Sequence, residues 1–125
     1  MEIRVTGGPK APSLMRSRVH SELSGDLPEQ QLAELHLLTS EVVTNSVRHG
    51  RVGCDGWVSS NVSVTGDRVR VEVRDSAPIR GLPERREPDY EDGGGFGLFL
   101  LDEVAARWGV EQESGLCVWF ELALP

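Results

Sequence analysis

The most informative stretch of this chain is EVVTNSVRHG, residues 41–50. It ends a helix that we expect to begin near Pro28 and to run to about His49, because proline suits a first helical turn and Gly50 stops a helix. Three apolar residues of this helix recur at helical spacing and should face a core: Leu35, Leu38 and Val42. We therefore expect a helix with one buried side at the centre of the fold.

The same helix carries a polar side formed by Glu41, Asn45 and Arg48, at positions i, i+4 and i+7. The amide oxygen of Asn45 is a ligand that Mg²⁺ accepts, and Glu41 one turn earlier can act as a general base. Arg48 can reach a phosphate or interact with the helix C-terminus, and His49 can contact a ligand or fill a core position. Taken alone, the Glu41–Asn45 pair favours the simpler interpretation of a solvated helix face.

The pattern around this helix predicts an α+β fold. Over residues 68–75, for example, valines alternate with charged residues, which is typical of a half-buried antiparallel strand. In the first helix we expect Leu14, Val19 and Leu23 to be buried. The other predicted elements are a strand at 2–5, helices at 11–23 and 96–108, and strands at 56–65, 68–75, 109–113 and 117–124. This order indicates a single domain over 1–125, a two-layer α/β sandwich with helices on one face of a mixed, mostly antiparallel sheet.

Two further segments complete a candidate site. Asp75 ends an apolar strand, where its carboxylate can accept a hydrogen bond from the exocyclic amine of adenine or simply start a turn. Helix 96–108 is opened by Gly93-Gly94-Gly95-Phe96-Gly97-Leu98. Glycines let the backbone approach a phosphate, and the free N–H groups of a first helical turn supply donors. A hinge with a helix start is the alternative, but four glycines in five residues exceed what a cap requires. A polar helix side, an aspartate at a strand end and a glycine-rich helix start, in this order along the chain, together predict an ATP site.

Composition narrows the class of protein. The 125 residues carry a formal net charge of −7, which argues against a nucleic-acid backbone as partner. No apolar stretch approaches the roughly 20 residues that span a bilayer, and the first residues lack a secretion signal, so we expect no membrane partner and a cytoplasmic location. Cys54 and Cys117 form no CxxC motif, and Lys10 is the only lysine, so a Walker-type phosphate loop is absent.

These segments resemble the boxes of the GHKL ATPase superfamily, which includes gyrase and histidine kinases. Residues 41–50 are similar to its N box, Asp75 to the aspartate of its G1 box, and Gly95-Phe96-Gly97-Leu98 to its G2 box. Over about 11–124 the chain looks most like the small bacterial anti-sigma-factor serine/threonine kinases and related ATP-binding regulators. The resemblance implies ATP and Mg²⁺ between the helices and a flexible lid at 76–94. It places nucleotide-binding roles on these positions: Asn45, Arg48, His49, Asp75, Ala77, Gly93, Gly94, Gly95, Phe96, Gly97, Leu98 and Cys117.

Two interpretations of function stay open. In the first, the protein sequesters a sigma factor and phosphorylates an antagonist protein (an anti-anti-sigma factor), with Glu41 as catalytic base and Asn45 as metal ligand; the resemblance also implies a homodimer. In the second, it is a non-catalytic ATP-binding module. Departures from the family pattern favour the second: Ala77 and Ile79 replace two G1-box glycines, and Cys117 replaces a threonine. A histidine kinase fragment fits poorly, because no phosphoacceptor helix precedes the domain in this sequence.

Overall fold

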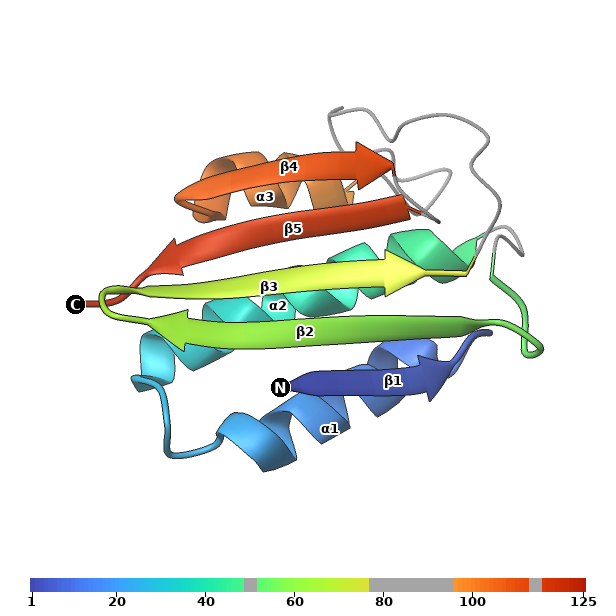
Figure 1. Cartoon of the computed structure of the whole chain (residues 1–125), viewed down its shortest axis with the longest axis horizontal. Coiled ribbons are helices and arrows are strands. Elements are labelled where there is room, and N and C mark those ends of the chain that lie inside the picture. The colour runs from blue at the N-terminus through green and yellow to red at the C-terminus, as the bar shows by residue number, and fades with distance from the viewer. Residues whose placement is uncertain (49–51, 77–95, 113–115) are drawn as a thin grey trace.

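A computed structural model describes residues 1–48, 52–76, 96–112 and 116–125 of the chain. The described elements follow the predicted order of strand, helix, helix, hairpin, helix and hairpin (Figure 1). Their bounds are β1 Glu2–Thr6, α1 Ala11–Leu23, α2 Glu29–Val47, β2 Trp57–Thr65, β3 Arg68–Asp75, α3 Phe96–Val104, β4 Arg107–Gln112 and β5 Leu116–Ala123.

The strands form one five-stranded sheet in the order β1-β2-β3-β5-β4. All four pairings are antiparallel. Figure 1 shows the three helices behind this sheet, so that one face is covered by helices and the other is bare of any described element. The predicted α+β two-layer architecture is thereby confirmed, with a sheet that is antiparallel in each described pairing.

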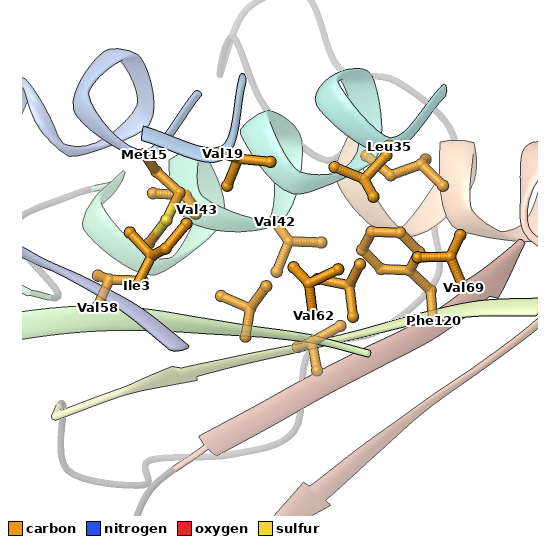
Figure 2. Close-up of a cluster of buried hydrophobic side chains, with 14 of the residues drawn as sticks. Ile3, Met15, Val19, Leu35, Val42, Val43, Val58, Val62, Val69 and Phe120 are labelled. Carbon is orange, nitrogen blue, oxygen red and sulfur yellow. The ribbon is translucent and has the colours of Figure 1, made fainter. Parts of the chain in front are cut away.

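The core lies between α1, α2 and the helix-covered face of the sheet. Alternation on β3 buries Val69, Val71 and Val73 and turns the charged residues between them to the bare face. On α2 the stripe of Leu35, Leu38 and Val42 is buried, as its spacing predicted. Figure 2 shows side chains from the helices and the strands meeting in this layer, including Met15, Val43, Val58 and Phe120.

The prediction that Leu14 is buried was wrong. Leu14 is 42% exposed, whereas Ala11, Met15, Val19 and Leu23 form the buried stripe of α1. These four residues follow one another every four positions, and Leu14 lies one position away from that line.

The third helix was predicted too long. It ends at Val104 rather than Trp108, and Trp108 belongs to β4. The Ala106 N–H donates to the Glu121 carbonyl 2.9 Å away, which starts the pairing with β5. Apolar Trp108 and Val110 alternate with other residues at a period of two, and strand pairing with β5 outweighs the helix propensity of the preceding alanines.

A pair of histidines joins the two long helices. His20 Nδ1 on α1 lies 3.1 Å from His36 Nε2 on α2, and one of these nitrogens must donate to the other. Next to them the Arg16 guanidinium donates to Ser40 Oγ at 3.1 Å. Burial, followed by the proximity of His20 and Arg16, lowers the pKa of His36 below its ordinary 6.5.

A matched pair of leucines tests the core. We expect Leu38→Ala to lower the free energy of unfolding by about 2–5 kcal/mol, because Leu38 is fully buried and its loss leaves a cavity. Leu14→Ala makes the same chemical change at an exposed position and should cost less than about 1 kcal/mol. Urea unfolding followed by circular dichroism measures both, and equal losses would contradict the placement of Leu14.

The histidine pair predicts a dependence of stability on pH. Since His36 has a lower pKa in the folded chain than in the unfolded chain, unfolding takes up a proton as the pH falls below about 6.5. Stability should therefore change little from this group above pH 6.5 and decline below it. In His36→Gln the decline between about pH 6.5 and 5.5 should be shallower in urea unfolding. Parallel curves for the two proteins would show that His36 makes no such contribution.

Candidate nucleotide-binding site

The three sequence segments of the predicted site converge at one end of the molecule. In Figure 1, α2 and β3 end at the same end of the sheet, and α3 begins there. The topology requires this for α3, since β4 runs parallel to β3 and only two residues separate the end of α3 from the start of β4. The candidate site is therefore on the helix-covered side, at the C-terminal ends of α2 and β3.

The polar side of α2 is accessible at this end. Glu41 and Asn45 are both half-buried and one turn apart on the helix. Arg48 is the C-cap residue, and its backbone N–H donates to the Thr44 carbonyl. The structure thus brings the carboxylate and the amide to one side of α2, as the spacing predicted.

Asp75 lies at the end of β3, directly across from Val58 on β2. It is only 2% exposed. The residue after it is fixed by two hydrogen bonds to Trp57: the Ser76 N–H donates to the Trp57 carbonyl at 3.1 Å, and the Trp57 N–H donates to Ser76 Oγ at 3.0 Å. These bonds hold the strand end on which Asp75 lies, and its carboxylate is in a buried environment, where a carboxylate needs hydrogen-bond donors.

A close backbone contact holds the chain after α2 against β1. The Gly7 N–H donates to the Gly56 carbonyl at 3.0 Å, and the Gly8 N–H donates to the Val52 carbonyl at 3.0 Å. A Cβ on Gly7 would lie 2.3 Å from the Gly53 carbonyl oxygen, so no larger residue fits without a shift. Gly7 therefore fixes the turn that leads from the end of α2 into β2.

Ser46 is a residue of this region that sequence reasoning missed. It is buried and continues the core-facing stripe of α2 one turn after Val42. The signal was present in the sequence, because a serine interrupts an otherwise apolar stripe next to Asn45. A hydroxyl here adds a polar group on the core-facing side of α2, close to the C-terminal end of the helix.

Other predicted site residues lie partly or wholly outside the described part of the chain. Phe96, Gly97 and Leu98 form the start of α3. The proposed ligand residues His49, Ala77, Gly93, Gly94 and Gly95 fall outside the described residues, as does the predicted lid apart from Ser76. Their roles stay predictions.

The structure does not bring Cys117 to the side of Asp75. Cys117 is buried but pairs with Arg74 and Glu111, whose side chains belong to the bare face of the sheet, whereas its neighbours Leu116 and Val118 face the helices. Burial raises the pKa of the Cys117 thiol, with Arg74, Glu72 and Glu111 as charged neighbours. The expected contact of Cys117 with adenine gains no support from this position.

Two classes of feature are absent from the described residues. No group of three or more histidine, cysteine, aspartate or glutamate side chains there is arranged to hold a metal ion. Among the described helices, none has the length and apolar character needed to cross a bilayer.

The family model described as "Histidine kinase-like ATPase domain" matches residues 9–122, a range that includes all three segments of the site. The chain belongs to this family. The match confirms the resemblance to GHKL-type domains, and family membership implies ATP binding. A carboxylate such as that of buried Asp75 can accept a hydrogen bond from an amine, and an amide oxygen such as that of Asn45 is a ligand that Mg²⁺ accepts, so both groups are compatible with a magnesium nucleotide.

Individual relatives within the histidine kinase-like ATPase family are distant. The chain is 28% identical to the serine-protein kinase RsbW of Listeria monocytogenes serotype 4a over 100 residues, covering 71% of this chain and 64% of the relative. RsbW of Bacillus pumilus is 28% identical over 102 residues, covering 71% and 63%. The chain thus spans less than two thirds of the length of these kinases.

A solved structure shows the same fold. The blue-light-activated histidine kinase of Erythrobacter litoralis EL346 superposes with a TM-score of 0.58 at 24% identity, over 93% of this chain and 42% of that protein. At this identity the likeness supports the histidine kinase-like ATPase fold and no finer statement.

Proposed function

We propose that this protein binds Mg-ATP at the C-terminal ends of α2 and β3 and acts as an anti-sigma-factor-type serine/threonine kinase. The observation that carries the proposal is the convergence of the Asn45 side of α2, the buried carboxylate of Asp75 and the start of α3 at one end of the sheet. The family match across these segments and the name of the RsbW relatives support it.

Asp75 has the properties of an adenine-recognition residue. A carboxylate is an acceptor only, so it selects the exocyclic amine of adenine over the carbonyl of guanine. The strand end that carries Asp75 is held by the Trp57–Ser76 hydrogen bonds, and a carboxylate that has no proton to donate penalises a ligand that turns a carbonyl oxygen toward it.

Asn45 and the start of α3 are proposed to hold the metal and the phosphates. Asn45 would give its amide oxygen to Mg²⁺, whose charge would offset that of the phosphates. The backbone N–H groups of 93–97, with the favourable dipole of α3, would hold the phosphate oxygens, and Arg48 and His49 are the remaining candidates for contact.

Glu41 is proposed as the base of the transfer step. It would accept the proton of a serine or threonine hydroxyl on the antagonist protein while that oxygen takes the terminal phosphoryl group. Sequestering of a sigma factor, a cytoplasmic location and a homodimer complete the proposal by analogy with anti-sigma-factor kinases.

A non-catalytic ATP-binding interaction module is the second candidate. It is favoured by the departures at Ala77, Ile79 and Cys117 from the family pattern, together with the position of Cys117 away from Asp75. The two candidates share the ATP site and differ in phosphoryl transfer.

The ATP site is tested by calorimetric titration of ATP with and without Mg²⁺. We expect Asp75→Asn to weaken ATP binding by at least about tenfold, because it removes a charge-assisted hydrogen bond. Asn45→Ala should abolish most of the gain in affinity that Mg²⁺ gives. Asn61→Ala is the matched control, since Asn61 is exposed on the bare face and should leave binding unchanged. Wild-type protein that binds no ATP would overturn the proposal.

Glu41→Gln separates the two functions. If Glu41 is the base, phosphoryl transfer from ATP to a serine-containing antagonist protein should fall by about 10²–10⁴-fold, with ATP affinity nearly unchanged. Glu34→Gln makes the same change two turns earlier on α2 and should transfer normally. Intact ATP binding without transfer by the wild type would favour the interaction module instead.

A further inference from the structure

The end of β3 is built differently from the rest of its hairpin with β2. In a regular antiparallel ladder, the two residues of a hydrogen-bonded pair exchange both of their backbone bonds. Trp57 and Ser76 come directly after the Val58–Asp75 pair, and the Ser76 N–H donates to the Trp57 carbonyl as this pattern requires. The Trp57 N–H, however, donates to Ser76 Oγ at 3.0 Å. A side-chain hydroxyl thus takes the place that a backbone carbonyl has in a regular pair.

A glycine leaves room for this hydroxyl. A Cβ on Gly56 would lie 2.7 Å from Ser76 Oγ, which is too close for either atom to stay in place. Gly56 is held in turn by two backbone bonds, because its N–H donates to the Gly53 carbonyl at 2.9 Å and its carbonyl accepts from the Gly7 N–H at 3.0 Å. The hydroxyl of Ser76 therefore lies against a piece of backbone that further hydrogen bonds hold.

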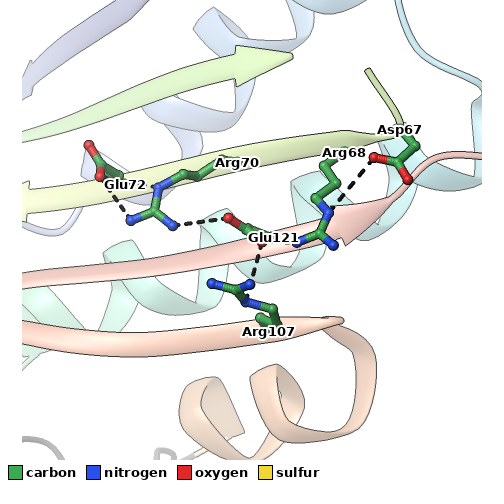
Figure 3. Close-up of polar contacts among 6 residues, drawn as sticks. All are labelled: Asp67, Arg68, Arg70, Glu72, Arg107 and Glu121. Carbon is green, nitrogen blue, oxygen red and sulfur yellow. Dashed lines mark hydrogen bonds and ion pairs between the residues drawn. The ribbon is translucent and has the colours of Figure 1, made fainter. Parts of the chain in front are cut away.

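The opposite end of β3 is held by ion pairs with β5. Glu121 on β5 accepts hydrogen bonds from Arg68 at 3.0 Å and from Arg70 at 3.1 Å, and Arg107 on β4 lies 3.5 Å from it (Figure 3). Arg68 and Arg70 both belong to the first half of β3. These contacts therefore tie the beginning of β3 to its neighbour, and leave its last residues to other interactions.

Asp75 lies beyond the support that β5 gives. In the described part of the chain, the ladder between β3 and β5 runs from Arg68 to Arg74 and stops one residue before Asp75. On the other side, Asp75 faces Val58 of β2, and the next residues along, Trp57 and Ser76, are joined by the two bonds described above. The place of the Asp75 backbone is therefore set mainly from β2, next to the Ser76 hydroxyl.

We propose that Ser76 is a positioning residue for Asp75, and that its hydroxyl holds the strand end where the carboxylate can distinguish adenine from guanine. The inference rests on the adenine role proposed for Asp75. Without the hydroxyl, the Trp57 N–H would lose its acceptor or bond to the carbonyl of residue 76, and each change would move the strand end. A displacement of about 1 Å is enough to weaken a contact that depends on direction.

The test compares ATP and GTP affinities by calorimetric titration in the presence of Mg²⁺. We expect Ser76→Ala to weaken ATP binding by about three- to tenfold and GTP binding much less, so that the preference for ATP narrows. Ser76→Thr keeps the hydroxyl and should restore most of that preference. Ser63→Ala removes a hydroxyl from an exposed position on β2 in the same hairpin, and should change neither affinity.

A second pair of variants separates positioning from a general loss of stability. Gly56→Ala should push the hydroxyl away and narrow the preference as Ser76→Ala does. In the double variant the second change should add less than about a twofold loss, because both changes break the same contact. Arg68→Ala loosens the opposite end of β3, and should leave the ratio of ATP to GTP affinity unchanged even if it lowers the melting temperature.

The outcomes distinguish this inference from the function on which it rests. Wild-type protein that prefers ATP, together with an unchanged ratio of affinities in Ser76→Ala, would overturn the positioning role and leave the ATP site intact. Equal weakening of ATP and GTP binding, or a loss that Ser76→Thr does not restore, would also overturn it. Wild-type protein that binds no nucleotide, or binds ATP and GTP alike, would overturn the role of Asp75 and this inference with it.

Discussion

The packing of α2 on one face of the sheet is the constraint on which the rest of this structure depends. Its stripe of Leu35, Leu38 and Val42 buries apolar surface against the valines of β3 and against Phe120. Because a strand directs successive side chains to opposite faces, this contact also decides what lies on the other side. The charged residues of β3 and β5 are driven to the bare face, and Asp75, which falls in line with the valines, is driven inward.

Much of the fold could be predicted from local patterns. The bounds of α1 and the order of the elements follow from periodicity, breakers and turn residues that each segment carries within itself. The errors arose where tertiary contacts decide. The sequence near 105–108 suits a helix, and only pairing with β5, which lies later in the chain, makes it a strand. Leu14 is apolar and helical, but the line through Met15 and Val19 faces the core.

The candidate site could also be predicted only in part, because some of its features depend on local spacing and others on tertiary contacts. The spacing of Glu41 and Asn45 is local, so the sequence placed both on one side of α2. The meeting of this side of α2 with Asp75 and the start of α3 depends on the topology of the sheet. From the sequence it could be predicted only through the resemblance of the three motifs to a known family. The face on which Cys117 lies depends on the register of β5 against β3, which no local pattern encodes, and the arginines around Glu121 come together through the same register.

The two-residue turn at Gly66-Asp67 has a consequence for how this protein can vary. It sets the register of β3 against β2, so that Asp75 lies across from Val58. A one-residue slip of β3 would place Arg74 in the inward position and reverse the sign of the charge at the candidate site. The same slip would turn the valines of β3 outward to the bare face and its arginines inward to the core. Insertions or deletions in this turn should therefore be accepted in evolution only when the same side chains of β3 still face the helices.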